Sequence, residues 1–153
     1  MKYNIPDVGE YEINTIVLDL NGTLSVNGII EDDTIDKLSQ LKELGFEIIL
    51  LTGDQRGTAQ GFCDKLGLTL LKAKNGEDKT ELMKQFNPET TAAIGNARID
   101  IGTFKGAKIS IATLQSEGIH TGIIEHVDII IPRIQDALNI FIEPDVMAAT
   151  MRV

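Results

Sequence analysis

Short runs rich in β-branched and other apolar residues alternate along this chain with segments whose apolar residues recur at helical spacing. In order, the predicted elements are a strand at 15–20, a helix at 33–44, a strand at 46–51, a helix at 58–66 and a strand at 68–71. Parallel strands need such crossovers, because the chain must return to the starting edge of the sheet before the next strand begins. The alternation therefore predicts an α/β protein with a mainly parallel sheet.

Residues at the predicted helix ends support this assignment. Asp32 and Asp33 are predicted to cap the first helix, and Gly45 is predicted to end it. Gly67 is predicted to end the second helix in the same way. The segment Asp78-Lys79-Thr80-Glu81 is typical of a capped start, and the helix that follows it is expected to carry Leu82, Met83 and Phe86.

Further elements are expected on both sides of these. Strands are predicted at 92–94, near 108–111 and near 128–131, and the tail is predicted to be helical at 133–142, with Pro144 starting a short last turn. The runs Tyr3-Asn4-Ile5 and Tyr11-Glu12-Ile13 flank a turn-like segment, which predicts a hairpin on the edge of the sheet.

Composition limits the partners of the chain. Its 153 residues match one domain, residues 1–153, with no linker-like stretch. A net charge of −9 with scattered Lys and Arg argues against nucleic acid and anionic membrane as partners. The longest apolar runs fall far short of the roughly 20 residues that cross a bilayer, so we expect a cytoplasmic protein. A single cysteine, Cys63, excludes an intrachain disulfide and is expected to be a buried, inert thiol.

Polar residues at the strand ends are the first candidates for chemistry, because open parallel sheets bind ligands beyond the carboxyl ends of their strands. Asp19 ends the first core strand and is followed by an Asn21-Gly22 turn, which can hold a carboxylate among backbone N–H donors suited to phosphate. Thr52 and Gly53 follow the next strand and offer a hydroxyl and an amide. From these residues alone, a hydrogen-bonded loop at Asp19 and a helix cap at Thr52 stay open as alternatives.

Two later segments add a cation and an oxygen pair. Lys79 lies at a predicted helix start, where the helix dipole disfavours a cation, so a nearby anion would explain it; a solvated surface lysine is the alternative. Asn96 and Asp100 are four residues apart after another strand, a spacing at which both side chains can face one hard cation through oxygen. Either side chain could instead cap its own loop.

Together these segments resemble the four motifs of the haloacid dehalogenase (HAD) superfamily in order, spacing and placement at strand ends. The matching segments are Asp19-Leu20-Asn21-Gly22-Thr23, Thr52, Lys79 and the segment 95–100. The segment 50–59 is similar to the phosphorylation domain of P-type ATPases. The resemblance to the HAD superfamily extends from about residue 16 to residue 131. Within the superfamily, the chain is most similar to soluble P-type-ATPase-like proteins.

This resemblance implies a three-layer, Rossmann-like HAD fold without a cap domain. One loop, one helix and one predicted strand account for nearly all residues between Asp19 and Thr52. The same holds for the residues between Thr52 and Lys79. No cap domain and no ATP-binding domain is therefore expected between these motifs. Without that domain and without membrane spans, we do not expect an ion pump.

The resemblance also implies a Mg²⁺-dependent phosphatase or phosphotransferase that works through an aspartyl-phosphate on Asp19. Thr52, Gly53 and Lys79 would hold the phosphoryl oxygens. Mg²⁺ would be bound by Asp19, the backbone carbonyl of Asn21, and the side chains of Asn96 and Asp100. The expected partner is a phosphorylated substrate, either a small molecule or a macromolecule, and a homo-oligomer is compatible with a capless chain.

Two positions depart from the family pattern. Asn21 stands where HAD phosphatases carry the Asp that acts as general acid and base, and Asn96 stands where they carry an Asp that binds magnesium. Loss of a general acid typically lowers a rate by about 10²–10⁴. We therefore expect slow turnover.

Two other classes of function compete with this one. A catalytically impaired binding or regulatory module of the same fold would also be consistent with Asn21 and Asn96. A receiver-like signalling domain is disfavoured, because receivers place their phosphorylated Asp on a later strand, whereas Asp19 ends the first core strand.

Overall fold

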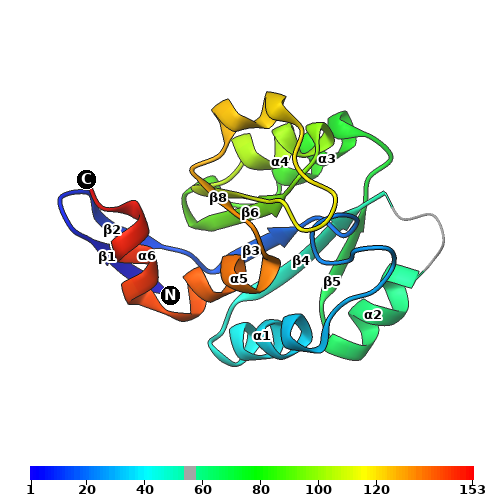
Figure 1. Cartoon of the computed structure of the whole chain (residues 1–153), viewed down its shortest axis with the longest axis horizontal. Coiled ribbons are helices and arrows are strands. Elements are labelled where there is room, and N and C mark those ends of the chain that lie inside the picture. The colour runs from blue at the N-terminus through cyan, green and yellow to red at the C-terminus, as the bar shows by residue number, and fades with distance from the viewer. Residues whose placement is uncertain (54–57) are drawn as a thin grey trace.

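A computed structural model describes residues 1–53 and 58–153, without the side chain of Thr58. Its core is a six-stranded, all-parallel sheet in the order β5-β4-β3-β6-β7-β8 (Figure 1). The strands are β3 (Thr15–Leu18), β4 (Glu47–Thr52), β5 (Thr69–Lys72), β6 (Thr91–Gly95), β7 (Ile109–Thr113) and β8 (Ile129–Ile131). The predicted parallel sheet is confirmed.

Helices cover both faces of the sheet and make three layers (Figure 1). On one side lie α1 (Asp32–Glu43), α2 (Thr58–Leu66) and α5 (Ile134–Ile142), and on the other lie α3 (Gly76–Met83) and α4 (Ile101–Lys105). Strand β3 is buried on both faces: Ile16 and Leu18 pack with the first group of helices, and Val17 packs with Met83 of α3. Because successive side chains of a strand point to opposite faces, this wholly buried strand requires helices on both faces of the sheet. The three-layer Rossmann-like fold is confirmed.

Short 3₁₀ helices fill part of the connections. They are η1 (Pro88–Thr90), η2 (Arg98–Asp100) and η3 (Thr121–His126). Within the described residues, no helix is both long and apolar enough to cross a membrane. Cys63 is fully buried in α2, as expected.

The ends of α1 confirm one prediction and correct another. Gly45 follows the helix with φ of +93°, a backbone conformation that favours glycine and ends a helix. The N-cap is Glu31, which makes no side-chain capping bond, so the prediction that Asp32 and Asp33 cap the helix is wrong. Both aspartates lie in the first turn, where their charges face the positive end of the helix dipole.

The N-terminal hairpin lies apart from the main sheet, so the prediction that it lies on the sheet edge is wrong. Its strands, β1 (Lys2–Ile5) and β2 (Gly9–Glu12), pair only with each other, because β3 directly follows them and already has β4 and β6 on its two sides. The hydroxyl of Tyr3 donates a hydrogen bond of 2.7 Å to the Phe141 carbonyl. Helix α6 (Pro144–Met151) packs on β1, and it is a full helix rather than the single turn predicted.

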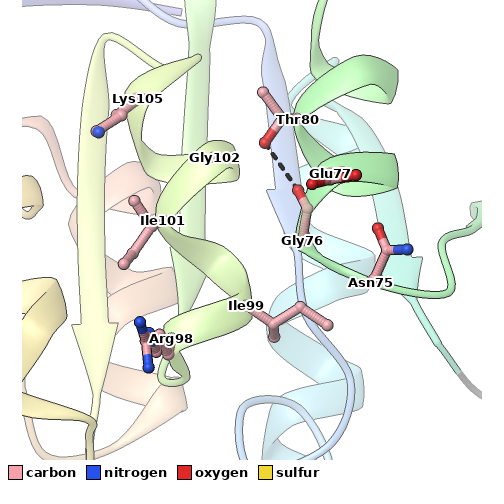
Figure 2. Close-up of a pocket in the computed structure, with 9 residues that line it drawn as sticks. All are labelled: Asn75, Gly76, Glu77, Thr80, Arg98, Ile99, Ile101, Gly102 and Lys105. Carbon is pink, nitrogen blue, oxygen red and sulfur yellow. Dashed lines mark hydrogen bonds between the residues drawn. The ribbon is translucent and has the colours of Figure 1, made fainter.

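Helices α3 and α4 pack closely together at Gly102, beside a surface groove of about 750 Å³ (Figure 2). A β-carbon at Gly102 would lie 1.8 Å from Thr80 Oγ1 and 3.1 Å from the Thr80 Cα. The Oγ1 atom is held by a hydrogen bond of 2.7 Å to the Gly76 carbonyl. The two helices can therefore pack at this distance only if position 102 lacks a side chain.

We expect Gly102→Ala to lower the free energy of unfolding by about 1–3 kcal/mol, because the added methyl group forces α3 and α4 apart. Urea unfolding followed by circular dichroism measures the change. Gly61→Ala is the matched control: it lies within α2, its β-carbon meets nothing within 4 Å, and it should be neutral or stabilising. Equal stabilities of the two variants would contradict the expected clash.

Candidate functional site

The polar residues at the ends of three parallel strands lie at one edge of the sheet. In the register of the sheet, Leu18 of β3 lies beside Leu50 of β4 and Ile94 of β6. Asp19 therefore emerges between the end of β4, which carries Thr52, and the end of β6, which leads to Asn96. Since parallel strands all finish at the same edge, the strand-end residues come together there without further loops.

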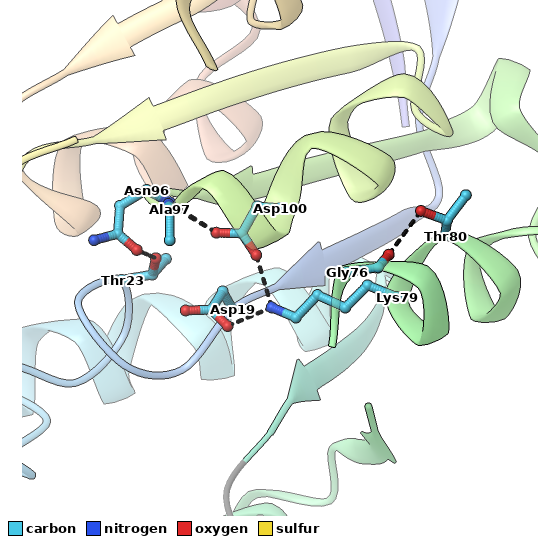
Figure 3. A network of polar contacts seen from close by, with 8 residues as sticks. All are labelled: Asp19, Thr23, Gly76, Lys79, Thr80, Asn96, Ala97 and Asp100. Atoms are coloured by element: carbon cyan, nitrogen blue, oxygen red, sulfur yellow. Dashed lines mark hydrogen bonds and ion pairs between the residues drawn. The ribbon is translucent and has the colours of Figure 1, made fainter. Parts of the chain in front are cut away.

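Lys79 lies between two carboxylates at this edge (Figure 3). Its Nζ atom is 2.6 Å from Asp19 Oδ1 and 2.7 Å from Asp100 Oδ1, and the lysine is 1% exposed. Helix α3 begins at Gly76, with the Asn75 side chain as its N-cap, three residues before Asp78, where the predicted capped start begins. The two carboxylates are the anions that account for a buried cation so near a helix start, and a solvated surface lysine is excluded.

Asp100 holds its own loop as well as Lys79. Its Oδ2 atom accepts hydrogen bonds from the backbone amides of Asn96 and Ala97, at 3.1 and 3.0 Å. A β-carbon at Gly95 would lie 2.6 Å from this oxygen, so the close approach of the carboxylate requires glycine there. Both Asp100 oxygens thus accept hydrogen bonds, two at Oδ2 and one at Oδ1, which leaves Oδ1 a lone pair for a further partner.

Asn96 and the turn after Asp19 also meet. Asn96 Oδ1 accepts a hydrogen bond from Thr23 Oγ1 at 3.4 Å, and its Nδ2 donates to the Gly118 carbonyl at 3.2 Å. Gly22 turns the chain with φ of +78°, and Asn21 before it is exposed. The amide of Asn96 is thereby oriented with its oxygen toward the turn that follows Asp19.

Burial and charge set the protonation of this group. Burial, followed by the charge of Asp100, raises the pKa of Asp19 to about 6, while Lys79 opposes this shift. Burial pulls the pKa of Lys79 down, but the charges of Asp19 and Asp100 outweigh it, and the pKa is raised overall. Lys79 is therefore protonated at neutral pH. With both carboxylates ionised, the three residues carry one net negative charge, which a phosphate can approach more easily than an all-acidic cluster.

The oxygen atoms at this edge suit a divalent metal ion in kind. The carboxylate of Asp19, the backbone carbonyl of Asn21 and the amide oxygen of Asn96 are the hard donors that such ions prefer. Only Asp19 among these donors is charged, and the described residues contain no group of three His, Cys, Asp or Glu side chains that could hold a metal. The residues present therefore fit a weakly held hard cation better than a tightly bound one.

The second predicted motif is described only in part. Thr52 is 1% exposed at the end of β4, and its carbonyl accepts a hydrogen bond of 3.0 Å from the Ala73 amide. Gly53 is exposed next to it, and a β-carbon there would lie 3.0 Å from the Ala73 carbonyl oxygen. The rest of the segment similar to P-type ATPases, 54–57, lies outside the described residues. Phosphate binding by Thr52 and Gly53 stays a prediction.

One carboxylate at this edge is absent from the sequence prediction. Glu117 lies in the loop after β7, and its Oε2 atom is 2.5 Å from the point where a Gly22 β-carbon would lie. Asn96 Nδ2 is also 2.5 Å from that point, so the turn at Gly22 lies against both groups. The predicted strand near 108–111 ends at the same edge, and extending the search for polar strand ends to its loop would have found Glu117.

Two surface grooves in the described part of the chain are lined by none of these residues. The groove of Figure 2 includes none of the predicted site residues. It is lined by residues in and next to α3, η2 and α4: Asn75, Gly76, Glu77, Thr80, Arg98, Ile99, Ile101, Gly102 and Lys105. A second groove, of about 400 Å³, lies beside the turn after Asp19 and is bordered by Leu24, Gln115 and Arg133. It borders the candidate site more closely than the first.

A family model of haloacid dehalogenase-like hydrolases matches residues 28–108. A copper-exporting P-type ATPase from Staphylococcus saprophyticus is 30% identical over 94 residues, which are 60% of this chain and 12% of the ATPase. A soluble P-type ATPase-like phosphatase from Methanocaldococcus jannaschii is 22% identical over 133 residues, which are 84% of this chain and 49% of the phosphatase. The chain thus spans half or less of the length of these relatives.

Solved structures agree on the fold. A deoxy-D-mannose-octulosonate 8-phosphate phosphatase from Haemophilus influenzae, in a cobalt-bound form, superposes with a TM-score of 0.75 at 16% identity, covering 92% of this chain and 93% of that one. A 3-deoxy-D-manno-octulosonate 8-phosphate phosphatase from Moraxella catarrhalis, in complex with magnesium, phosphate and KDO, gives a TM-score of 0.75 at 16% identity, covering 90% and 92%. At these identities the likeness concerns the fold.

Proposed function

The chain belongs to the haloacid dehalogenase-like hydrolase family, and from this premise we propose that it is a slow, Mg²⁺-dependent phosphatase or phosphotransferase that acts through an aspartyl-phosphate on Asp19. The observation that carries this proposal is the buried Lys79, which contacts both Asp19 and Asp100 at the carboxyl edge of the sheet. A nucleophilic carboxylate with a fixed cation beside it suits an incoming phosphoryl group, whose charge must be balanced as it transfers.

In the first step, an oxygen of Asp19 attacks phosphorus while the bond to the leaving oxygen breaks. Lys79 places its charge beside Asp19, and Thr52 with the Gly53 amide would hold other phosphoryl oxygens. In the second step, water attacks phosphorus, the bond to Asp19 breaks, and inorganic phosphate leaves. Catalysis of this kind depends mostly on positioning and on balancing charge.

Mg²⁺ would be held by Asp19, the Asn21 carbonyl, and the side chains of Asn96 and Asp100. When bound, the ion would offset the charge of the phosphoryl group. The oxygen donors support this assignment, and their low total charge supports weak affinity.

We expect Asn96→Asp to bind Mg²⁺ more tightly, by about 1–2 kcal/mol, because a carboxylate adds charge where the amide has none. Isothermal titration calorimetry on both proteins measures the difference. Asn87→Asp is a suitable control, since Asn87 caps a 3₁₀ helix at the opposite end of β6. Equal affinity in Asn96→Asp and the unaltered protein would remove Asn96 from the metal site.

Incubation with acetyl phosphate and Mg²⁺, followed by intact mass measurement, tests the proposed intermediate. The protein should gain one phosphoryl group, and Asp19→Asn should gain none. If the protein gains no phosphoryl group, or if Asp19→Asn gains the same group, Asp19 is not the nucleophile. A screen of phosphorylated metabolites should begin with sugar-acid phosphates, because similar solved structures are named for such a substrate.

A binding module of the same fold is the second candidate. It is favoured by one observation: the hydrogen bonds of Asp100 and Asn96 satisfy both side chains within the loops, as a purely structural site would. An absent phosphoenzyme together with measurable phosphate binding would support it.

A further inference from the structure

We propose that the groove of about 400 Å³ beside the turn after Asp19 binds the leaving group of the substrate, which is the alcohol part of the phosphate ester. Its lining selects a leaving group with several hydroxyl groups, such as a sugar or a polyol. The proposal rests on the proposed function, because it names the class of ester that would react at Asp19. None of the described residues that line the groove belongs to the segments that resemble HAD motifs.

The groove lies beyond the carboxyl ends of three strands. Leu24 follows β3, Gln115 follows β7 and Pro132 follows β8. Open parallel sheets bind ligands at this edge, and about 400 Å³ is a usual size for a small-molecule site. An in-line attack by Asp19 places the departing oxygen on the far side of phosphorus. The rest of the substrate is therefore expected beyond the sheet edge, where the groove lies.

One wall of the groove is apolar and belongs to a tight hairpin. Val26 and Ile29 exchange two backbone hydrogen bonds, each 3.0 Å long, around the turn residues Asn27 and Gly28. Both turn residues have positive φ, at +52° and +79°, as a two-residue hairpin turn of this kind requires. Ile29 is 69% exposed although it is large and apolar. The carbon skeleton of a bound leaving group would remove part of this surface from water.

Gln115 joins the loops that border the groove. Its side-chain amide donates to the Thr23 carbonyl at 3.0 Å and accepts from the Ile134 amide at 3.1 Å. Its backbone amide donates to the Pro132 carbonyl at 2.8 Å. Gln115 has φ of +46°, a strained conformation that persists only where the surroundings hold it and that is common at ligand sites. The ends of β3, β7 and β8 are thus fastened together around the groove.

Two opposite charges in the groove contact one buried amide. Gln135 is 3% exposed, and its Oε1 atom accepts from Arg133 Nε at 3.3 Å. Its Nε2 atom donates to Glu31 Oε2 at 2.6 Å and to Thr34 Oγ1 at 3.0 Å. Within the part of the chain that the structure describes, the Nη groups of Arg133 and the Oε1 atom of Glu31 have no hydrogen-bond or ion-pair partner. Gln135 therefore positions two charged groups that can bind a ligand.

This pair of charges explains the preference for hydroxyl groups. A guanidinium only donates hydrogen bonds and a carboxylate only accepts them, whereas an alcohol hydroxyl does both. Neighbouring hydroxyls of a sugar can therefore accept from Arg133 and donate to Glu31 at the same time. An aromatic leaving group offers neither partner, so binding it would remove water from both charges without replacing the hydrogen bonds.

Isothermal titration of phosphate esters into Asp19→Asn protein tests the groove without measuring activity, because this variant cannot form an aspartyl-phosphate. The esters are glycerol 3-phosphate, ribose 5-phosphate, glucose 6-phosphate and 6-phosphogluconate, with phenyl phosphate as the comparison and Mg²⁺ present throughout. The best of the four should bind about 10-fold or more tightly than phenyl phosphate. Adding Arg133→Met should weaken that binding about 10- to 100-fold, and adding Glu31→Gln about 10-fold, since each removes hydrogen bonds to a charged group.

Matched variants control for a general change of charge. Arg152→Met is the control for Arg133→Met, because Arg152 is exposed at the end of α6, which packs on β1. Glu47→Gln is the control for Glu31→Gln, because Glu47 is exposed at the start of β4, on the opposite edge of the sheet. Both controls should keep the affinity of the Asp19→Asn protein. Circular dichroism checks that each variant is folded.

The outcomes separate the groove from the reaction. If none of the four esters binds more tightly than phenyl phosphate, or if Arg133→Met binds as tightly as Arg152→Met, the role of the groove is overturned. Incubation with acetyl phosphate tests Asp19 separately, so a phosphoenzyme beside either of these results leaves the proposed function standing. If binding depends on Arg133 but no phosphoenzyme forms, Asp19 fails as the nucleophile while the groove stands as a site for sugar or polyol phosphates.

Discussion

Asn21→Asp is expected to raise the steady-state turnover of p-nitrophenyl phosphate about 10- to 10³-fold. Hydrolysis of an aspartyl-phosphate requires water to lose a proton as it attacks, and the amide of Asn21 cannot take that proton. Asn21 is exposed in the turn two residues after Asp19, so a carboxylate there would be in contact with solvent water. The gain should stay below the full range for a general base, because Asn96 still leaves the metal site short of charge.

The measurement must separate chemistry from metal binding. Turnover and phosphoenzyme decay should be compared at saturating Mg²⁺, where a change in affinity has no effect on the rate. Adding Asn96→Asp should raise turnover further, and Asp19→Asn should abolish it in every background. If Asn21→Asp leaves burst and steady-state rates at the level of Asp19→Asn, the chain is not a dormant phosphotransferase and the binding module takes its place.

Lys79→Met is expected to lower the free energy of unfolding by about 3–5 kcal/mol at neutral pH. The change removes the cation that contacts Asp19 and Asp100, whose side chains are 11% and 2% exposed. Two buried carboxylates then lack a counter-charge, and the pKa of Asp19, which Lys79 no longer lowers, should rise further above that of the unfolded chain. Protonation relieves this repulsion, so the loss should shrink as the pH falls.

Urea unfolding at pH 7 and at pH 5 measures both effects. Lys84→Met is the matched control, because Lys84 pairs with Glu81 on the surface and is 68% exposed, and it should change stability by less than about 1 kcal/mol. Combining Lys79→Met with Asp100→Asn should restore part of the stability by removing one buried charge. A Lys79→Met protein as stable as Lys84→Met would show that the buried ion pairs contribute little to the fold.

Local residue patterns were sufficient to predict most elements of this fold. The strand predicted at 15–20 occurs at Thr15–Leu18, and the helix predicted at 33–44 occurs at Asp32–Glu43, because both elements follow from the pattern of neighbouring residues. Gly45 and Gly67 end their helices with positive φ, a conformation that glycine adopts without steric cost. The same local reasoning failed at Asp32 and Asp33, because several adjacent acidic residues compete for one cap position.

The sequence by itself determined which residue types stand at the strand ends, including Asp19, Asn21, Asn96 and Asp100, because strand ends follow from local pattern. Only the tertiary structure decided which of them touch. Lys79 meets Asp19 across 60 positions of sequence and Asp100 across 21, and these contacts exist because β3 lies between β4 and β6 while α3 packs over one face. Strand order also kept the hairpin away from the main sheet and brought the loop of Glu117 against Gly22. Such contacts depend on how distant elements pack, and no local spacing encodes that packing.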